Sequence, residues 1–266
     1  MAELPNWSRF DELADRYDKY FLTTRNPARR LVELASPKEG SQVLEIGCGT
    51  GFATFQLADR VTASGEILAI DISEKMMNVG REKARAMGVN NVHFRAMDGT
   101  QLDLADSSFD LVISVHALFG FDNIPKAIGE WRRVLRDDGK VAFSSFSHDH
   151  KPVLQVPKVA EVISSYMTPP PDDRLPLDTQ AECRSTLQRA GFREINISTE
   201  ELGFHYQSFD EFWNDISSTT FRLRLNSLEE QSRRSLRSDL EATLQSEFSE
   251  SGLLNPVTTI LSIAHA

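Results

Sequence analysis

The sequence predicts an α/β protein: a seven-stranded, mostly parallel sheet with helices on both faces, plus N-terminal helices and helical insertions forming a lid. Three observations favour this fold. Short apolar runs alternate with helical patterns from residue 40 to residue 147, three alternating glycines follow the first apolar run, and two more strand-like runs come after residue 190. The 266 residues suffice for one large α/β domain with an embellishment or for two small domains.

Composition and charge narrow the class of protein. Hydrophobic residues make up 40% and charged residues 26% of the chain, as in an ordinary soluble globular protein. No run approaches the ~18 apolar residues of a membrane span, and Met1–Phe10 lacks the apolar stretch of a signal peptide. The two cysteines, Cys48 and Cys183, are too few for a disulfide framework or a zinc cage. We therefore expect a cytoplasmic protein with no metal and no membrane insertion.

The net charge of −10 argues against a nucleic-acid partner, because phosphate binding needs a basic surface. The local group Arg81, Lys83 and Arg85 fits the solvated face of a helix.

Seven segments are expected as strands, five in the first half of the chain and two near its end. They are short, apolar and rich in β-branched residues. Their ranges are Gln42–Ile46, Glu66–Ile70, Val92–Ala96, Phe109–Val115, Lys140–Phe146, Phe192–Ser198 and Val257–Ile263.

Helix signals lie between the strands of the first half. Ser73 is an N-cap candidate, and Gly88 suits the left-handed residue that ends a helix. Pro125 opens the next helix, whose apolar residues fall on one face. Asp137-Asp138-Gly139 then predicts a turn before the fifth strand.

The chain is divided into four parts, beginning with an N-terminal helical cap at 1–39. Ser8 and Asp11 form a capping-box pattern, apolar residues recur at helical spacing from Phe10 to Phe21, and a short helix follows Asn26-Pro27. The core of the sheet occupies 40–147.

An insertion at 148–178 follows, with a helical segment around Val153–Tyr166 and a break at Pro169–Pro171. The last part, 179–266, completes the sheet. Its first helix starts at Thr179, a lid insertion lies near 204–226, and a helix with leucines in register precedes the final strand.

The segment Glu45–Gly51 is the most informative in the sequence. A strand runs into Gly47, Gly49 and Gly51 and then into a helix, and glycine lets the backbone turn tightly and approach a ligand. A dinucleotide fingerprint would place its third glycine at position 52, which is Phe52. A nicotinamide cofactor is therefore disfavoured, although a turn that merely needs glycines stays open.

The second strand ends at Asp71, twenty residues after the last glycine of the loop. A carboxylate there can accept hydrogen bonds from both ribose hydroxyls of a nucleoside. Ile72 and Met76 follow and suit an adenine ring, although Met76 can equally pack its own helix.

The Glu-x-Gly-x-Gly-x-Gly pattern resembles the first motif of class I, Rossmann-like S-adenosylmethionine-dependent methyltransferases. Three further segments resemble that family in order: the strand ending at Asp71, the Met97-Asp98-Gly99 step, and the Phe109-Asp110-Leu111-Val112 strand with the downstream Arg133-Val134-Leu135. Asp137-Asp138-Gly139 replaces the family's usual Pro-Gly-Gly, which changes a turn and not the site.

Phe10–Tyr20 resembles the opening of the ubiquinone/menaquinone-type (methyltransferase type 11) small-molecule subgroup. The resemblance implies that S-adenosylmethionine is the cofactor and S-adenosylhomocysteine the product. It implies that Glu45 orients the methionine ammonium, that Asp98 and Gly99 meet the adenine, and that Tyr17 caps the carboxylate end. Cys48 is read as a small filler of the loop. The cofactor-binding candidates are Tyr17, Glu45, Gly47, Cys48, Gly49, Gly51, Asp71, Ile72, Met76, Asp98, Gly99 and Val115.

Two histidines are the catalytic candidates, because an acceptor hydroxyl or acidic carbon needs a base. His116 follows the fourth strand and His148 the fifth, at the sheet edge where α/β proteins place such groups. His116 can instead cap the loop over the cofactor. His148-Asp149-His150 can instead be a surface loop, since histidines two residues apart are poorly spaced to share a metal ion.

Aromatic residues are dense in the N-terminal segment and the insertions, which favours a small apolar or aromatic acceptor and O- or C-methylation. An aminopropyltransferase is disfavoured because its acidic pairs are missing. A non-catalytic cofactor-binding module stays open, as does an N-methyltransferase for RNA or protein. The residues after strand four read His116-Ala117-Leu118-Phe119, without the Asn/Asp-Pro-Pro-aromatic motif of amino-directed nucleic-acid enzymes. Monomer and homodimer are both compatible with the sequence.

Overall fold

The computed structural model describes residues 8–168, 174–219 and 221–266. The expected break at Pro169–Pro171 and most of the Met1–Phe10 segment lie outside these residues. The side chain of Ser8 is also not described, so its capping role stays a prediction. The helix α1 (Ser8–Asp11) nevertheless begins at Ser8.

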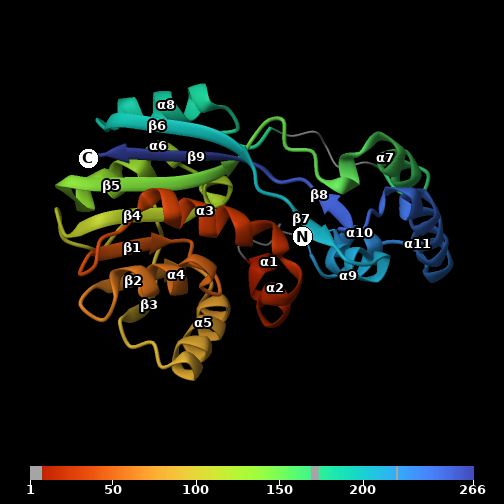
Figure 1. Cartoon of the computed structure of the whole chain (residues 1–266), viewed down its shortest axis with the longest axis horizontal. Helices are drawn as coiled ribbons and strands as arrows, with labels where there is room; N and C mark the ends of the chain where they lie inside the picture. The colour runs from red at the N-terminus through yellow and green to blue at the C-terminus, as the bar shows by residue number, and fades with distance from the viewer. Residues whose placement is uncertain (1–7, 169–173, 220) are drawn as a thin grey trace.

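A seven-stranded sheet organises the described chain, with strand order β3-β2-β1-β4-β5-β9-β6 (Figure 1). Strands β1 to β5 pair in parallel, and β9 runs antiparallel to both β5 and β6. The seven-stranded, mostly parallel sheet is confirmed. The bounds are β1 Gln42–Ile46, β2 Glu66–Asp71, β3 Val92–Ala96, β4 Phe109–Val115, β5 Leu135–Phe146, β6 Arg193–Glu201 and β9 Thr258–His265.

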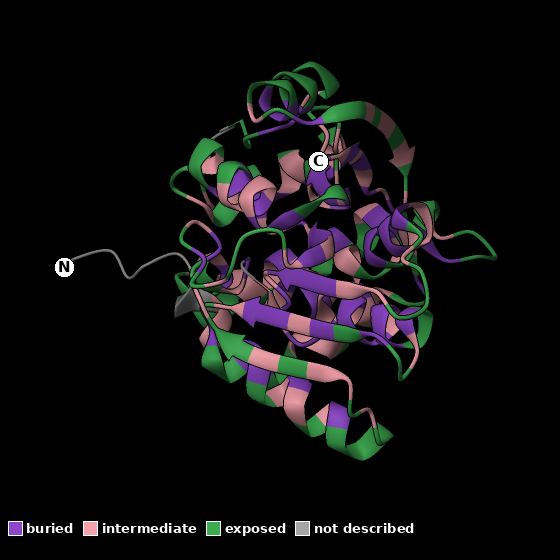
Figure 2. Cartoon of the chain, turned by 90° about the vertical axis from the view of Figure 1, so that its left-hand side faces the viewer, coloured by how far each residue is buried: buried purple, intermediate pink, exposed green. Residues whose placement is uncertain are grey.

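Burial across the sheet follows this order. The middle strands β1 and β4 are almost wholly buried (Figure 2). In the edge strands β3 and β6, half-buried and exposed residues follow one another. Parallel strands covered on both faces read as continuous apolar runs, which explains why the predicted ranges of β1 and β4 match the structure.

Helices cover both faces of the sheet. The hydrophobic cluster on one face takes its buried residues from α3, α4 and α5, and the cluster on the other takes them from α6 and α8. Ser73 caps α5 by accepting a hydrogen bond from the Met76 amide, and Gly88 ends it in the left-handed region, as predicted. The bounds are α3 Arg25–Ala35, α4 Phe52–Val61, α5 Glu74–Met87, α6 Ile124–Val134 and α8 Gln180–Arg189.

Two local predictions are wrong. The Asp137–Gly139 turn is instead a bulge inside β5: Leu135 pairs with Phe109 and Lys140 with Leu111, so the intervening residues loop out opposite one position of β4. The N-terminal helix is split into α1 and α2 (Ala14–Tyr20), because the Leu13 amide bonds the Phe10 carbonyl and closes a turn between them.

The two insertions pack on each other and, together with residues 236–253, share one hydrophobic cluster, which we call the lid core. The cluster gathers Val153, Val159, Ile163, Tyr206, Phe212, Ile216, Phe221, Leu225, Leu236, Leu240, Leu244 and Leu253. The surrounding helices stand beyond one end of the sheet, at the right in Figure 1. The elements are η3 Val153–Gln155, α7 Pro157–Ser164, β7 Phe204–Tyr206, α9 Phe209–Ser218, α10 Arg222–Asn226, α11 Glu230–Leu244, η4 Gln245–Glu247 and β8 Leu253–Asn255.

The sequence did not indicate the small antiparallel pair of β7 and β8, which closes the lid core. The remaining short elements are the 3-10 helices η1 Leu22–Thr24 and η2 Leu118–Gly120.

Candidate active site

The glycine loop after β1 turns back on itself at the carboxyl edge of the sheet. Gly47, Gly49 and Gly51 have φ of 73°, 54° and 93°, which side-chain-bearing residues rarely adopt. The amides of Gly47 and Cys48 both donate to the Ile70 carbonyl, at 2.8 and 3.0 Å. A Cβ on Gly47 would lie 2.5 Å from the Ala117 Cβ, so this glycine also lets the loop after β4 approach.

Asp71 ties the glycine loop to β2. One carboxylate oxygen accepts from the Gly49 amide at 2.8 Å, and the other accepts from the Ser73 amide at 2.9 Å. Burial raises the pKa of this carboxyl above its ordinary value, and the two amide bonds only partly oppose that effect. The carboxylate therefore holds the loop in place and also faces the cavity described next.

A cavity of ≈ 470 Å³ opens above the carboxyl ends of β1, β2 and β4. Ten of the predicted residues line it: Tyr17, Gly47, Gly49, Asp71, Ile72, Met76, Asp98, Gly99, Val115 and His116. Residues outside the cofactor-binding and catalytic candidates complete the wall: Phe10, Ile46, Ser73, Met97, Thr100, Ala117, Phe119–Asn123 and Lys126. Several of these follow β4 or open α6, and the position of strand ends is the signal that could have found them.

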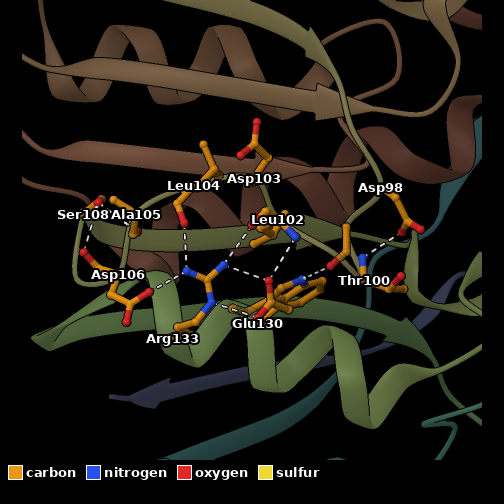
Figure 3. Close-up of polar contacts among 12 residues, drawn as sticks. Asp98, Thr100, Leu102, Asp103, Leu104, Ala105, Asp106, Ser108, Glu130 and Arg133 are labelled. Carbon is orange, nitrogen blue, oxygen red and sulfur yellow. Dashed lines mark hydrogen bonds and ion pairs between the residues drawn. The ribbon is translucent and has the colours of Figure 1, made fainter.

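The loop that carries Asp98 and Gly99 is fixed from below by Arg133 of α6 (Figure 3). The Arg133 guanidinium donates to the carbonyls of Leu102 and Leu104, at 2.9 and 2.7 Å, and pairs with Glu130. The Trp131 indole donates to the Gly99 carbonyl at 3.0 Å, and the Thr100 amide donates to Asp98 at 2.8 Å. These bonds hold the loop between β3 and β4, so Asp98 and Gly99 sit at a defined place on the cavity wall.

The N-terminal helices cover the glycine loop. The Tyr17 ring stacks on Phe21, with centroids 4.4 Å apart, and burial raises the pKa of its hydroxyl. Asp18 of α2 pairs with Lys83 at 2.7 Å and also accepts from the Thr50 hydroxyl. Asp11 accepts from the Ser73 hydroxyl at 2.5 Å. Helices α1 and α2 are thus attached to the loop and to α5, and they place Tyr17 and Phe10 against the cavity.

Three cofactor candidates do not line the cavity. Glu45 is 2% exposed and accepts from the Thr54 hydroxyl, and burial raises the pKa of its carboxyl to about 8. Cys48 is buried beside the loop, and Gly51 precedes α4 with its neighbouring space filled by Phe55. Cys48 and Gly51 belong to the loop and Glu45 to β1 before it, so these residues support the shape of the loop without lining the cavity. An ammonium contact for Glu45 stays a prediction.

The two catalytic candidates lie in different environments. His116 lines the cavity, is 5% exposed and has a φ of 45°. His148 lies outside the cavity with a side chain 64% exposed, and its Nδ1 is 3.5 Å from the Asp178 carboxylate. The structure therefore brings His116, and not His148, to the candidate site.

Burial also sets the charge of His116. It lowers the pKa of the ring to about 3, with a smaller contribution from His150. His116 is neutral near pH 7.

No group of three or more possible metal ligands occurs among the described residues. Within the same residues, no helix is long and apolar enough to cross a membrane.

Comparison with known proteins gives a family. A family model described as a methyltransferase domain matches residues 37–210. The Nocamycin O-methyltransferase of Saccharothrix syringae is 34% identical over 136 residues, which cover 51% of this chain and only 49% of that protein. The ubiquinone/menaquinone biosynthesis C-methyltransferase UbiE of Idiomarina loihiensis is 28% identical over 207 residues, which cover 70% of this chain and 82% of that protein.

A solved structure supports the fold. The phosphoethanolamine N-methyltransferase 2 of Haemonchus contortus, in complex with phosphomonomethylethanolamine and S-adenosylhomocysteine, matches with a TM-score of 0.61 at 18% identity. The match covers 96% of this chain and 57% of that one. At this identity the likeness shows the fold alone.

Proposed function

We infer the activity from one premise: this chain belongs to the class I S-adenosylmethionine-dependent methyltransferases. We propose that it transfers the methyl group of S-adenosylmethionine to a small, apolar or aromatic acceptor. The observation that carries the proposal is the cavity at the carboxyl edge of the sheet, where the glycine loop, Asp71 and an apolar wall meet.

The residues of the cavity fit this cofactor. Asp71 offers a carboxylate to ribose hydroxyls, and Ile72, 44% exposed in this structure, offers an apolar surface to an adenine ring. Gly47 and Gly49 leave the backbone open to a methionine portion. Lys126 is the single lysine or arginine among the residues that line the cavity, which suits a ligand without a pyrophosphate.

When bound, S-adenosylmethionine supplies a methyl group activated by a cationic sulfur. The chain itself has to hold the acceptor in line with that methyl and keep water out, effects worth several kcal/mol of the barrier. Tyr17 and Phe10 cover the cavity from the N-terminal side, and Phe119 and Phe121 wall the side after β4. We propose that these rings, with the lid at 148–178 and 204–226, enclose the acceptor.

Asp71 provides the test of cofactor binding. Two charge-assisted hydrogen bonds contribute roughly 1.5–3 kcal/mol each before water compensates, so Asp71→Ala should weaken S-adenosylhomocysteine binding by at least about tenfold. Calorimetry measures the dissociation constant, and thermal unfolding checks that the variant folds. An unchanged constant, or tight NADH binding by the unaltered chain, would contradict the assignment.

Turnover decides between an enzyme and a non-catalytic binding module. We expect labelled methyl groups to pass from S-adenosylmethionine to small aromatic acceptors and not to RNA or protein. Binding of S-adenosylhomocysteine without transfer to any acceptor would favour the binding module.

We further propose that the protein works in the cytoplasm, since both cysteines are free and buried. We expect the chain to act as a monomer or a homodimer, and light scattering on the purified chain distinguishes the two.

A further inference from the structure

Lys83 of α5 contacts the glycine loop. The sequence favours a solvated helix face for Arg81, Lys83 and Arg85, and Arg85 is exposed as expected. The side chain of Lys83 is instead only 29% exposed. Its Nζ donates to the Thr50 carbonyl at 2.8 Å and to the Asp18 carboxylate at 2.7 Å. Lys83 therefore joins the loop to α2 from a third element of the fold.

Lys83, Asp18 and Thr50 form a closed ring of hydrogen bonds. The second Asp18 oxygen accepts from the Thr50 hydroxyl, so Thr50 is held by both its side chain and its backbone. Thr50 is 1% exposed, whereas the side chains of Lys83 and Asp18 are 29% and 36% exposed. An ion pair this exposed contributes little by itself. The bonds to the buried Thr50 are therefore the part of the ring that acts on the loop.

The ring fixes one peptide group of the loop. The Thr50 carbonyl and the Gly51 amide belong to one planar trans peptide, so they point in opposite directions. The carbonyl accepts from Lys83, and the Gly51 amide donates to the Cys48 carbonyl at 2.9 Å. Both ends of this peptide are thus bonded directly after Gly49, which lines the cavity. Rotation of the peptide would change the loop where it borders the cavity.

Aromatic rings of α4 hold the ammonium in place. The Lys83 Nζ lies 5.4 Å from the Phe52 ring centroid and 5.2 Å from that of Phe55, within the range of cation–π attraction. Phe55 also fills the space beside Gly51, where a Cβ would lie 2.7 Å from its ring. The Phe52 ring is 6.1 Å from that of Tyr17. The ammonium is therefore held against the first turn of α4, whose first ring lies beside Tyr17.

The charge of Lys83 also acts on the carboxylate that supports the loop from β1. Burial and, to a smaller extent, the charge of Asp71 raise the pKa of Glu45 to about 8, and the positive charge of Lys83 opposes them. Lys83 thus favours the ionised form of Glu45.

We propose that Lys83 is a positioning residue for S-adenosylmethionine. Lys83 does not line the cavity, so it acts through the Thr50 peptide, which shapes the loop. It also acts through Asp18, which attaches α2 and places Tyr17 against the cavity. The inference rests on the proposed function and concerns the cofactor side of the same site.

Calorimetry with S-adenosylhomocysteine tests this role. Lys83→Met keeps an apolar stem against the rings of α4 and removes the ammonium. We expect the dissociation constant to rise about tenfold, because the Thr50 carbonyl and Asp18 lose a charged donor. Surface plasmon resonance should show most of the change in the dissociation rate, since α2 is then less firmly attached over the bound ligand.

Arg81→Met is the matched control on the same helix. Arg81 has a side chain 26% exposed. It donates to the side chains of Glu74 and Asn78 and to the Phe94 carbonyl. Arg81 thus makes at least as many bonds as Lys83 without reaching the loop, and its loss should leave the affinity within about twofold. Equal affinity losses in the two variants would show a general effect of loosening α5 and would overturn the role of Lys83.

Asp18→Asn tests whether the ring acts as a unit. Alone, it should weaken binding by about threefold, because the amide oxygen still accepts from Lys83. Combined with Lys83→Met, it should leave the affinity within about twofold of Lys83→Met alone, because no unpaired carboxylate remains. Fully additive losses, about 30-fold in total, would show that the two residues act separately, and the ring would then play no part in binding.

Kinetics separates positioning from catalysis. With saturating amounts of the small aromatic acceptor that the turnover assay identifies, Lys83→Met should raise the KM for S-adenosylmethionine about tenfold and leave kcat within about twofold. A loss confined to kcat, or an unchanged dissociation constant for S-adenosylhomocysteine, would contradict the inference and leave the proposed function intact. Failure of the unaltered chain to bind S-adenosylhomocysteine would remove both.

Discussion

The sheet half (residues 40–147) and the lid differ in the sequence separation between the residues that contact one another. In the sheet half, the glycine loop and the carboxylate that holds it, Gly49 and Asp71, are 22 residues apart. In the lid core, Val153 packs in one cluster with Phe212, Leu240 and Leu253. Local spacing therefore determines the cofactor side of the site, and long-range packing determines the side that we assign to the acceptor.

This difference assigns separate tasks to the two halves. The glycine loop, Asp71 and the loop between β3 and β4 form one continuous hydrogen-bonded unit around the cavity. Arg133 and Trp131 hold the second of these loops. The lid has its own hydrophobic cluster and meets that unit mainly through the N-terminal helices, as in the 3.0 Å pair between Arg222 and Glu12. We therefore expect changes in the lid core to alter transfer, and changes in the loop to alter cofactor binding.

The largest expected effect comes from Phe212→Ala in the lid core. Phe212 is 1% exposed and packs edge-on to Tyr206 at 5.4 Å. Its truncation should cost about 3–5 kcal/mol, enough to unfold a marginally stable unit. Each loss of about 1.4 kcal/mol changes the ratio of folded to unfolded lid by about tenfold. Labelled-methyl assays should therefore show transfer reduced by at least about tenfold. Calorimetry should show S-adenosylhomocysteine affinity within about twofold of the unaltered chain.

Phe143→Ala is the matched change in the sheet, where Phe143 of β5 is fully buried. It should reduce both transfer and cofactor affinity. If Phe212→Ala weakens cofactor binding as much as Phe143→Ala does, the two regions are one cooperative unit and the comparison fails.

Sequence patterns predicted the sheet half in detail. The ranges of β1 and β4 were predicted to the residue because parallel strands that are buried on both faces are mainly apolar runs between turn residues. The range of the edge strand β3 also matches, although its residues are half-buried or exposed. The bulge at Asp137–Gly139 was missed because its residues also suit a turn. Asp71 and the glycines were found because their spacing reflects a local geometry.

The lid and the environment of His116 could not be predicted in the same way. The pairing of β7 with β8 joins short segments about fifty residues apart, without a periodic pattern long enough to detect. The ring stack of His116, Phe146 and His150 depends on how strands β4 and β5 end side by side. His116 and His148 look equivalent in sequence, and only burial separates them.

Gly47→Ala is expected to have an intermediate effect, confined to the cofactor side. The new Cβ would meet the Ala117 Cβ at 2.5 Å and would force a side chain into a φ of 73°. The left-handed conformation alone costs roughly 1–2 kcal/mol, so S-adenosylhomocysteine affinity should fall by about tenfold or more once the loop shifts. Calorimetry measures the affinity and thermal unfolding the stability.

Gly88→Ala separates the strain from the clash. Gly88 has a φ of 70° with nothing within 4 Å of a new Cβ, and it lies at the far end of α5. This variant should lose a similar stability from strain but keep its cofactor affinity. Equal affinity in the two variants would mean that the close approach of Gly47 to the loop after β4 does not shape the site.

The last difference between the two regions is a pH dependence of stability, carried in each region by one buried acid. Burial raises the pKa of Glu45 from 4.5 to about 8 and that of Asp215, beside the Tyr206 hydroxyl in the lid, from 3.8 to about 7. Between the unfolded and folded values, the folded chain binds more protons than the unfolded chain. The stability contributed by each acid is therefore full below the unfolded value and is lost as the pH rises toward the folded value.

Glu45→Gln and Asp215→Asn remove these titrations one at a time. Glu45→Gln should flatten the loss of protection in β1 and α4 between about pH 4.5 and 8, and Asp215→Asn should flatten that in α9 between about pH 3.8 and 7. Segment-resolved hydrogen exchange across this range, corrected for the intrinsic rate, measures both. If the two regions open separately, each substitution changes only its own segments. If either substitution flattens the pH dependence of both regions equally, sheet and lid open together, because linkage then acts through a single unfolding equilibrium.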